Sequence, residues 1–560
     1  MRARAGEQRG LDIVARLLAA ACVCAGCGGD GSDARRRDAT PNVPVHGGTA
    51  VIAMGQEPES LIPYGIRSQA ATRVQSFLFG MLANTNEDLV SFGPWLARDD
   101  WEWSDDRKQL TMHLRDDVYW TDGVQVTAED VRFSWEVARD SLVGWRSAHW
   151  KRRVVDCEIV DRFTVRFHFD DVFFEQFRFA KEGFIVPKHL LAEVPREQWR
   201  TCDFARQPIG CGPFKLQSWE PGQRIVLVRN DNYFDKPKPY LERVVIEFVP
   251  EPSTRVGRLR AGSVDLVAAP ELPLRDAAEL RDAYEEGRGV VKVFSCRGRG
   301  YDFIGYNARD PLFASAAVRE ALTRAIDRQQ IVDALCFGFA EVFEGPIAPI
   351  LWAYDPSLPP TPHDPEGAKR LLAQEGWSDS DGDGWLDKNG ERFEFRMMTN
   401  NDNALRMQAI VPVQAYWRDI GVKVELESYE MQTALSLREQ GKSQAYYGGW
   451  NAGLSPAATL EGIWSCEARA GRWNFVHYCN PKVDSLTAVA GQVVEAAESQ
   501  PLFHEIQRLV SADHPYTWMY YDHSVSAHNE RLRGVVIDQR GVFLNMEEWY
   551  IPTAMQTAGP

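Results

Sequence analysis

Strand-like and helix-like patterns alternate along almost the whole chain. "TVRFHF", residues 164–169, places Val165, Phe167 and Phe169 on one face, as in a half-buried strand. "TAEDVRFSWEVARD", residues 127–140, begins with a threonine cap followed three residues later by an aspartate, as at the start of a helix. We therefore expect a mixed α/β protein with several lobes.

Two further stretches predict where helices begin and end. "DPEGAKRLLAQEGW" offers Asp364 as a cap, Pro365 in the first turn and Gly376 as a stop. The stretch 315–338 predicts two consecutive helices, the second beginning near Asp327. The chain of 560 residues is long enough for about three to four domains.

The composition excludes one class of partner. Hydrophobic residues make up 44% of the chain and charged residues 25%, which is usual for globular proteins. The net charge of −16 lacks the basic footprint that nucleic-acid binding requires. We therefore expect no nucleic-acid partner, and an acidic surface that favours solubility.

Residues 1–26 predict an export signal. Four arginines accompany "LLAAACVCAGC", whose apolar run of about ten residues is too short for the roughly 20 that span a bilayer. "CAGC" resembles a bacterial lipobox in which Cys27 is lipidated; Cys22, or cleavage without a lipid, is the alternative. Residues 27–48 predict a flexible tether. We expect a membrane-anchored protein of the periplasm or cell surface.

Motifs of common enzymes are incomplete or absent. "HEIQR" at His504 lacks the second histidine of a zinc protease, and "GKS" at Gly441 lacks the first glycine of a P-loop. Because the chain has 79 acidic residues, chance carboxylate pairs are easy, and a secreted hydrolase stays as an alternative. We expect a protein that is not an enzyme and requires no cofactor.

One stretch, "DSDGDGWLD", predicts a structural Ca²⁺ site. It spaces its aspartates as DxDxDGxxD, and alternating carboxylates around a tight glycine turn suit the many oxygen ligands of Ca²⁺. Gly390 stands where an EF-hand has its last glutamate, so a solvated acidic turn is the alternative. The predicted ligands are Asp379, Asp381, Asp383 and Asp387.

Seven cysteines follow the N-terminal region, and none forms a CxxC motif. An oxidising compartment permits disulfides, but an odd number leaves at least one thiol free or intermolecular. Cys202 and Cys211 are the local pair that we expect; the partners of Cys157, Cys296 and Cys336 stay open.

Three segments, in this order, resemble one known family. They are "LRDDVYWTDGVQVTAEDVRFSWE" (114–136), "PIGCGPFKLQSWEPGQRIVLVRNDNYF" (208–234) and "VREALTRAIDRQQIV" (318–332). They are similar to the extracellular solute-binding proteins of family 5, the oligopeptide- and dipeptide-binding components of ABC importers.

The resemblance implies an α/β fold, a periplasmic-binding-protein clamp of two lobes with an additional α/β domain (class II, cluster C type). Lobe one would combine residues 49–83, 208–300 and 522–560. The additional domain would be 84–207, and lobe two 301–521. Two crossings between the lobes would form a hinge that closes on the ligand.

The resemblance also implies a ligand pocket at "YYGGWNAGLSP", residues 446–456. Gly449, Trp450 and Asn451 would line it, with burial of Trp450 in a core as the alternative. Peptide-binding relatives carry an aspartate three residues after this tryptophan, where it grips the peptide's α-ammonium. Here that position is Gly453, so either another acid substitutes or the ligand lacks a free amine.

Further positions follow from the resemblance on weaker grounds. An arginine in the cleft would bind a ligand carboxylate. Cys466 and Cys479 match a disulfide of the dipeptide-binding branch. The remaining implied ligand-binding residues are Asn400, Met431, Arg438, Tyr521 and Trp145.

The predicted function is that of a substrate-binding lipoprotein of an ABC importer. It would capture peptides between its lobes as a monomer and deliver them to permease and ATPase subunits. A binder of oligosaccharides, or of another small solute without a free amine, is the first alternative.

Overall fold

The computed structural model describes residues 43–65, 68–469 and 473–556. The predicted signal, Cys27 and most of the predicted tether therefore lie outside the described residues. Within the described ranges, none of the helices combines the length and apolar character that a membrane crossing demands.

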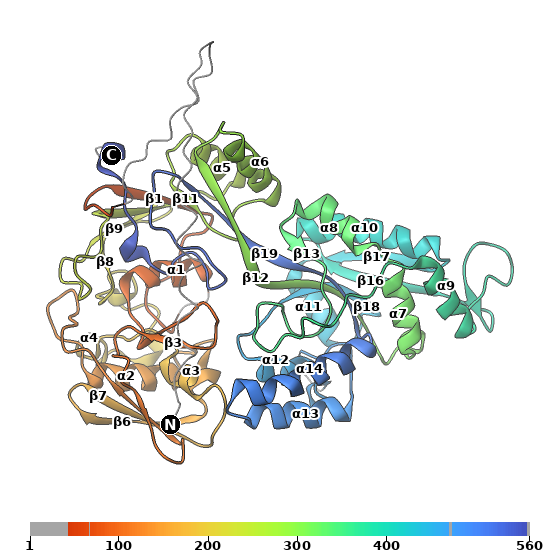
Figure 1. The fold of residues 1–560 in the computed structure, drawn as a ribbon, viewed down its shortest axis with the longest axis horizontal. Coiled ribbons are helices and arrows are strands. Elements are labelled where there is room, and N and C mark those ends of the chain that lie inside the picture. Colours follow the sequence, from red (N-terminus) through yellow and green to blue (C-terminus); the bar gives the residue numbers. More distant parts are fainter. Residues whose placement is uncertain (1–42, 66–67, 470–472, 557–560) are drawn as a thin grey trace, which may run out of the picture. The chain divides into compact units, whose positions relative to one another are not determined.

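Eleven strands form the main sheet, which mixes parallel and antiparallel pairs (Figure 1). β16 is parallel to both β17 and β18, whereas the long strands β12 and β19 pair antiparallel in the middle of the sheet. Along the sheet the strands are β17 (Lys423–Tyr429), β16 (Glu394–Asn400), β18 (Ala445–Asn451), β12 (Val291–Tyr306), β19 (Tyr516–Asn529), β11 (Leu266–Val267), β1 (Thr49–Met54), β10 (Arg243–Phe248), β9 (Arg224–Arg229) and β8 (Phe214–Glu220), with β13 (Ala340–Glu341) on β19.

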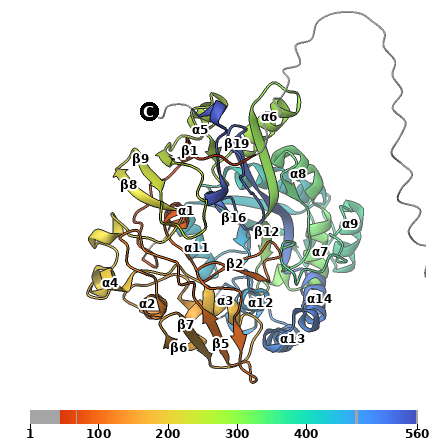
Figure 2. The same ribbon diagram turned by 60° about the vertical axis from the view of Figure 1, so that its left-hand side comes forward.

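A second sheet of four antiparallel strands lies in the sequence between β1 and β8. The helix α2 packs against β6 and β7 of this sheet (Figure 2). Its strands are β4 (Glu102–Trp103), β5 (Gln109–His113), β7 (Thr164–Phe169) and β6 (Val154–Asp161). Two separate hairpins pair β2 (Ala83–Thr85) with β3 (Phe92–Pro94) and β14 (Asp387–Lys388) with β15 (Glu391–Arg392).

Helices connect most of these strands, as expected of a mixed α/β chain. The α-helices are α1 (Gln69–Leu78), α2 (Ala128–Arg139), α3 (Gln176–Lys181), α4 (Lys188–Leu191), α5 (Pro252–Arg260), α6 (Leu274–Glu285), α7 (Ala316–Arg324), α8 (Arg328–Cys336), α9 (Pro365–Gln374), α10 (Ala404–Asp419), α11 (Met431–Glu439), α12 (Pro456–Trp464), α13 (Pro481–Gln492) and α14 (Ala496–Ala512). Short 3₁₀ helices are η1 (Ala148–Lys151), η2 (Arg196–Gln198), η3 (Asp203–Ala205), η4 (Pro311–Phe313), η5 (Glu467–Arg469), η6 (Met546–Glu548) and η7 (Thr553–Met555).

The local signals placed several helix ends correctly. The Asp364 side chain accepts from the backbone N–H of Gly367 and caps α9, while Gly376 follows the helix with a positive φ of 86°. Asp327 caps α8, as predicted for the second of two consecutive helices. These ends were predictable because a cap acts through residues only a few positions away.

Four clusters of buried hydrophobic residues hold the fold together. Two of them draw all their buried members from residues 301–521. A third joins buried residues from 50–268 and 532–551, and so includes residues of both the predicted lobe one and the predicted additional domain. The domain boundaries stay predictions.

Of the two predicted disulfides, the structure confirms one and contradicts the other. Cys466 and Cys479 form the disulfide that the resemblance implied. Cys202 and Cys211 do not pair: both thiols are free, and Cys202 Sγ instead donates to the carbonyl oxygen of Trp199 at 3.4 Å. Nearness in sequence did not bring these two thiols together.

Candidate functional site

Two neighbouring parallel strands carry half of the predicted ligand-binding residues. β16 ends at Asn400 and β18 at Asn451. The antiparallel strand β12 reaches the same edge near Gly300, which pairs with Asn451. Ligands of α/β proteins bind at the carboxyl ends of parallel strands, so this edge is the candidate site.

Arg438, on α11, lies within a box of aromatic rings at this edge. Its guanidinium carbon is 4.6 Å from the ring centre of Phe475, 5.3 Å from that of Trp450 and 5.4 Å from that of Tyr446. Only 7% of the residue is exposed, and its Nε is buried without a hydrogen-bond partner among the described residues. Such rings stabilise a cation, but they do not replace the hydrogen bonds of a carboxylate.

The stretch that contains Trp450 is mostly core, and its last residues border the candidate site. Tyr446 and Tyr447 are buried, whereas Trp450 is only partly buried. The Trp450 ring stacks on Phe303 at 6.0 Å between centres, and its Nε1 donates to Tyr516 Oη at 3.3 Å. The core side therefore fixes the orientation of the ring that faces Arg438.

A buried ion pair occupies the other side of the strand ends. Arg406, in the first turn of α10, donates to both carboxylate oxygens of Asp302, at 2.7 and 2.9 Å. Tyr520 Oη donates to the same carboxylate at 2.9 Å. Burial lowers the pKa of Arg406, but the charge and hydrogen bonds of Asp302 outweigh it and raise that pKa above its usual value.

The other predicted residues take different positions. Asn400 is fully buried, where it accepts from Arg406 and donates to Asp402. Met431 begins α11, the helix of Arg438, and is partly buried. The hydroxyl of buried Tyr521 donates to the carbonyl oxygen of Gly298 in β12.

Two further positions singled out from the sequence are Trp145 and Gly453. Trp145 lies outside this edge, with its ring edge-on to Tyr64 at 5.1 Å between centres. Gly453 is exposed just before the cap of α12. The roles of all these residues in ligand binding stay predictions.

Sequence reasoning missed Asp302 and Arg406, which are 104 residues apart. No local spacing connects them, and each stands in an ordinary polar context. The one available signal was "RGRGYD", residues 297–302, because two glycines around an arginine inside a strand indicate a close approach of another chain segment.

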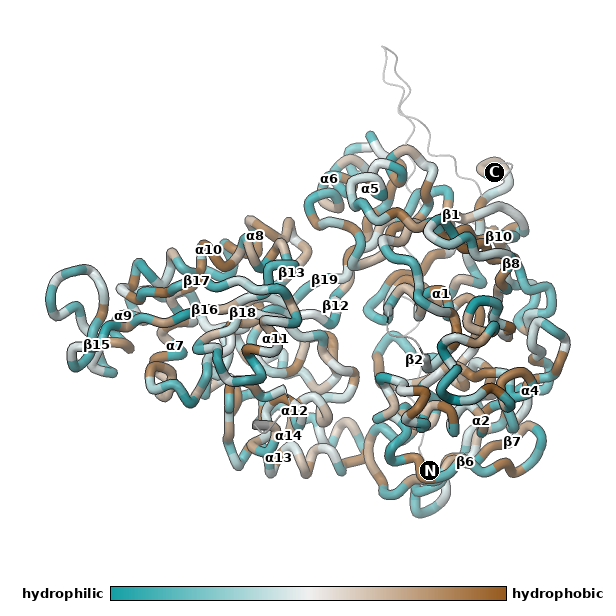
Figure 3. The backbone as a smooth tube through the Cα atoms, turned by 180° about the vertical axis from the view of Figure 1, so that it is seen from behind, coloured by the Kyte–Doolittle hydropathy of each residue, from teal (hydrophilic) through white to brown (hydrophobic). Residues whose placement is uncertain are grey.

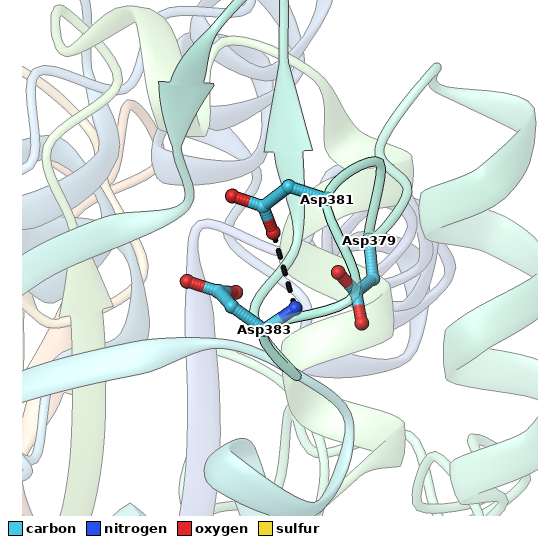
Figure 4. A group of neighbouring side chains, drawn as sticks. All are labelled: Asp379, Asp381 and Asp383. Atoms are coloured by element: carbon cyan, nitrogen blue, oxygen red, sulfur yellow. Dashed lines mark hydrogen bonds between the residues drawn. The ribbon is translucent and has the colours of Figure 1, made fainter.

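The predicted calcium loop, residues 379–387, follows α9 and ends at the start of β14. Figure 4 draws three of its aspartates, and Figure 3 shows mostly hydrophilic colours beside β15. Asp379, Asp381 and Asp383 each place a carboxylate oxygen within 4.8 Å of the others. Asp383 also pairs with Arg392. Asp387 lies outside this group and instead accepts from the Ser380 amide and hydroxyl, at 2.9 and 2.8 Å.

Three comparisons connect this geometry to known proteins. Residues 91–471 match the family of bacterial extracellular solute-binding proteins, family 5. The chain is 28% identical to the oligopeptide-binding protein AppA of Bacillus subtilis over 97% of this chain and 98% of that protein. It is 25% identical to heme-binding protein A of Haemophilus influenzae, covering 85% of this chain and 86% of that one.

The fold matches as well. The structure of Bacillus subtilis AppA in complex with a nonapeptide superposes with a TM-score of 0.72 at 27% identity, and the match covers 91% of this chain and 100% of that one. The periplasmic-binding-protein fold with two α/β lobes is therefore the fold of this chain. The chain belongs to the bacterial extracellular solute-binding proteins of family 5, which bind solutes for transport and are not enzymes.

Proposed function

We propose that this protein captures peptides at the carboxyl ends of β16 and β18 and delivers them to the permease and ATPase subunits of an ABC importer. The observation that carries the proposal is Arg438, a buried guanidinium that the described part of the chain leaves without a carboxylate. A peptide's carboxyl terminus would supply that partner through charge-assisted hydrogen bonds.

The relatives support the same ligand class. AppA of Bacillus subtilis is named an oligopeptide-binding protein, and its structure holds a nonapeptide. Gly453 favours a second candidate, a solute without a free amine such as an oligosaccharide, because it offers no acid for an ammonium group. The aromatic rings around Arg438 would suit either ligand.

A thermal-shift screen of the ligand-stripped protein tests the proposal. The probes are a free peptide, the same peptide amidated at its carboxyl terminus, and an oligosaccharide of similar size. At a hundredfold excess over Kd, a bound ligand stabilises the folded protein by about 2.7 kcal/mol. A shift with the free peptide and a weaker one with the amide supports the proposal. A shift with the oligosaccharide alone replaces it by the second candidate.

We also propose that Cys27 carries a lipid that anchors the protein outside the cytoplasmic membrane, as a monomer on a flexible tether. The lipobox-like "CAGC" supports this assignment. Mass spectrometry of the N-terminal peptide of the exported protein tests it. Cys27→Ala should release the protein into the soluble fraction, and an unmodified Cys27 in the native protein would overturn the anchor.

A further inference from the structure

Asp522, on β19, is held at the same strand ends by a distortion of its neighbour β12. The register between the two strands shifts between Arg297 and Tyr301 of β12, which leaves residues 298–300 as a bulge opposite Asp522. A Cβ at Gly300 would lie 2.7 Å from Asp522 Oδ2, so the carboxylate occupies space that any other residue there would fill. Bulges of this kind commonly aim a side chain at a binding site.

A second oxygen converges on the same point. The Cβ position above Gly300 lies 3.5 Å from Asn451 Oδ1, and Asn451 is the exposed last residue of β18. The carboxylate of Asp522 and the amide oxygen of Asn451 can both accept hydrogen bonds. Together they suit a cation that carries several N–H donors.

The charges around Asp522 do not balance. The titratable groups that interact electrostatically with the Asp522 carboxylate are Asp302 on β12, Arg406 on α10, the Cys336 thiol on α8 and the hydroxyls of Tyr520 and Tyr521 on β19. Arg406 gives its bidentate bond to Asp302. Within residues 43–65, 68–469 and 473–556, neither an ion pair nor a hydrogen bond joins the Asp522 carboxylate to another group. Two carboxylates thus share one cation.

The electrostatics agree with a missing partner. Burial, followed by the negative charge of Asp302, raises the pKa of the Asp522 carboxyl to about 7, although Arg406 opposes this shift. An ammonium group beside Asp522 would restore the charge balance and stabilise the ionised form.

We propose that Asp522, with Asn451 beside it, binds an ammonium group of the ligand. This inference rests on the proposed peptide-binding function and deepens it, because Asp522 would replace the acid that is missing at Gly453. The ammonium would come from the peptide's amino terminus or from a lysine side chain. Asp522 and Arg438 would then serve opposite charges of one ligand.

Titration calorimetry on the purified protein tests the assignment. The probes are a free peptide, its N-acetylated form, and an N-acetylated peptide with one lysine. Wild type is compared with Asp522→Asn and with the control Asp402→Asn. Asp402 is an exposed carboxylate at the same edge, where it accepts from Asn400. We expect Asp522→Asn to weaken binding of the free peptide about 30-fold or more and to leave the N-acetylated peptide unchanged. If Asp522→Asn instead loses affinity for the N-acetylated peptide with one lysine, the ammonium comes from a lysine side chain of the ligand.

Two outcomes overturn the inference while leaving the peptide function intact. In one, wild type binds the free peptide and Asp522→Asn binds it equally well. In the other, Asp402→Asn causes the same loss as Asp522→Asn. If wild type binds none of the peptides, the proposed function fails, and a measurement without ligand decides the inference.

That measurement is the melting temperature of wild type and Asp522→Asn from pH 4 to pH 8. A carboxyl whose pKa is raised by folding keeps its proton longer in the folded than in the unfolded state, so wild type loses stability as pH rises from about 4 to about 7. Asp522→Asn should match wild type at pH 4 and exceed it at pH 8. Parallel curves would show that Asp522 is already compensated and would overturn the inference.

Discussion

Arg406 and Arg438 are both largely buried at the same end of the main sheet, but among the described residues a carboxylate neutralises Arg406 and none pairs with Arg438. Arg406 makes a bidentate bond to Asp302, whereas Arg438 is surrounded by Phe475, Trp450 and Tyr446. Because both charges of the completed pair are largely buried, losing either partner would leave an uncompensated charge in the interior. A buried cation that lacks its anion is available for a ligand instead, and the aromatic rings reduce the cost of keeping it there.

The largest expected effect comes from breaking the completed pair. Asp302→Ala leaves Arg406 buried without its carboxylate, and we expect the free energy of unfolding to fall by about 3–5 kcal/mol. Urea denaturation measures the change. Glu366→Ala, which removes the exposed partner of Lys369, is the control and should change little. Equal effects of the two substitutions would mean that Asp302 does not neutralise Arg406.

Removing the other arginine should separate stability from binding. Arg438→Met keeps much of the side-chain volume and removes a charge that pairs with no carboxylate in the described part of the chain, so we expect the unfolding free energy of the ligand-free protein to change little. Peptide affinity should fall by about 1.5–3 kcal/mol, the contribution of hydrogen bonds to a charged group. Calorimetry with free and carboxyl-amidated peptides measures this loss.

The two peptides act as each other's control. Arg438→Met should abolish any preference of the protein for the free carboxyl terminus over the amide. If the preference persists, another cation binds the carboxylate and the contrast between the two arginines is wrong.

A smaller loss of stability is expected from a substitution at Gly449, whose backbone lies against the Asp302–Arg406 ion pair. A Cβ at position 449 would lie 2.1 Å from Arg406 Nη2 and 2.4 Å from Asp302 Oδ1. Gly449→Ala should therefore displace the pair and cost about 1–3 kcal/mol of stability. Gly453→Ala is the matched control, since its Cβ would lie 2.9 Å from the Thr459 hydroxyl and 4.0 Å from the Ser455 amide, away from the ion pair. Similar losses in both variants would show that the pair tolerates displacement.

The smallest effect on stability concerns a group of exposed carboxylates, Asp379, Asp381 and Asp383. If the loop binds Ca²⁺, a tenfold excess of the ion over Kd should stabilise the protein by about 1.4 kcal/mol. Chelator should then lower the melting temperature of wild type but not that of Asp381→Ala combined with Asp383→Ala. If chelator does not change the melting temperature of wild type, the calcium hypothesis is wrong and the loop is a solvated acidic turn.

Prediction from sequence succeeded where the signal was local. Asp364 and Asp327 mark helix starts because a side-chain cap acts within one turn, and Val165 and Phe167 mark a buried face because a strand alternates every two residues. It failed for Cys202 and Cys211, because a disulfide requires a mutual orientation that short separation does not provide.

The sequence by itself determined the alternating elements and the family, since periodicity, caps and ordered motifs all lie along the chain. The site near Trp450 stays a prediction. Only the tertiary structure decided which charges meet. Asp302 reaches Arg406 across 104 residues, and Asp522 comes over Gly300 because of a bulge between two strands. Charge compensation depends on distances in space, and the packing of the sheet fixes those distances.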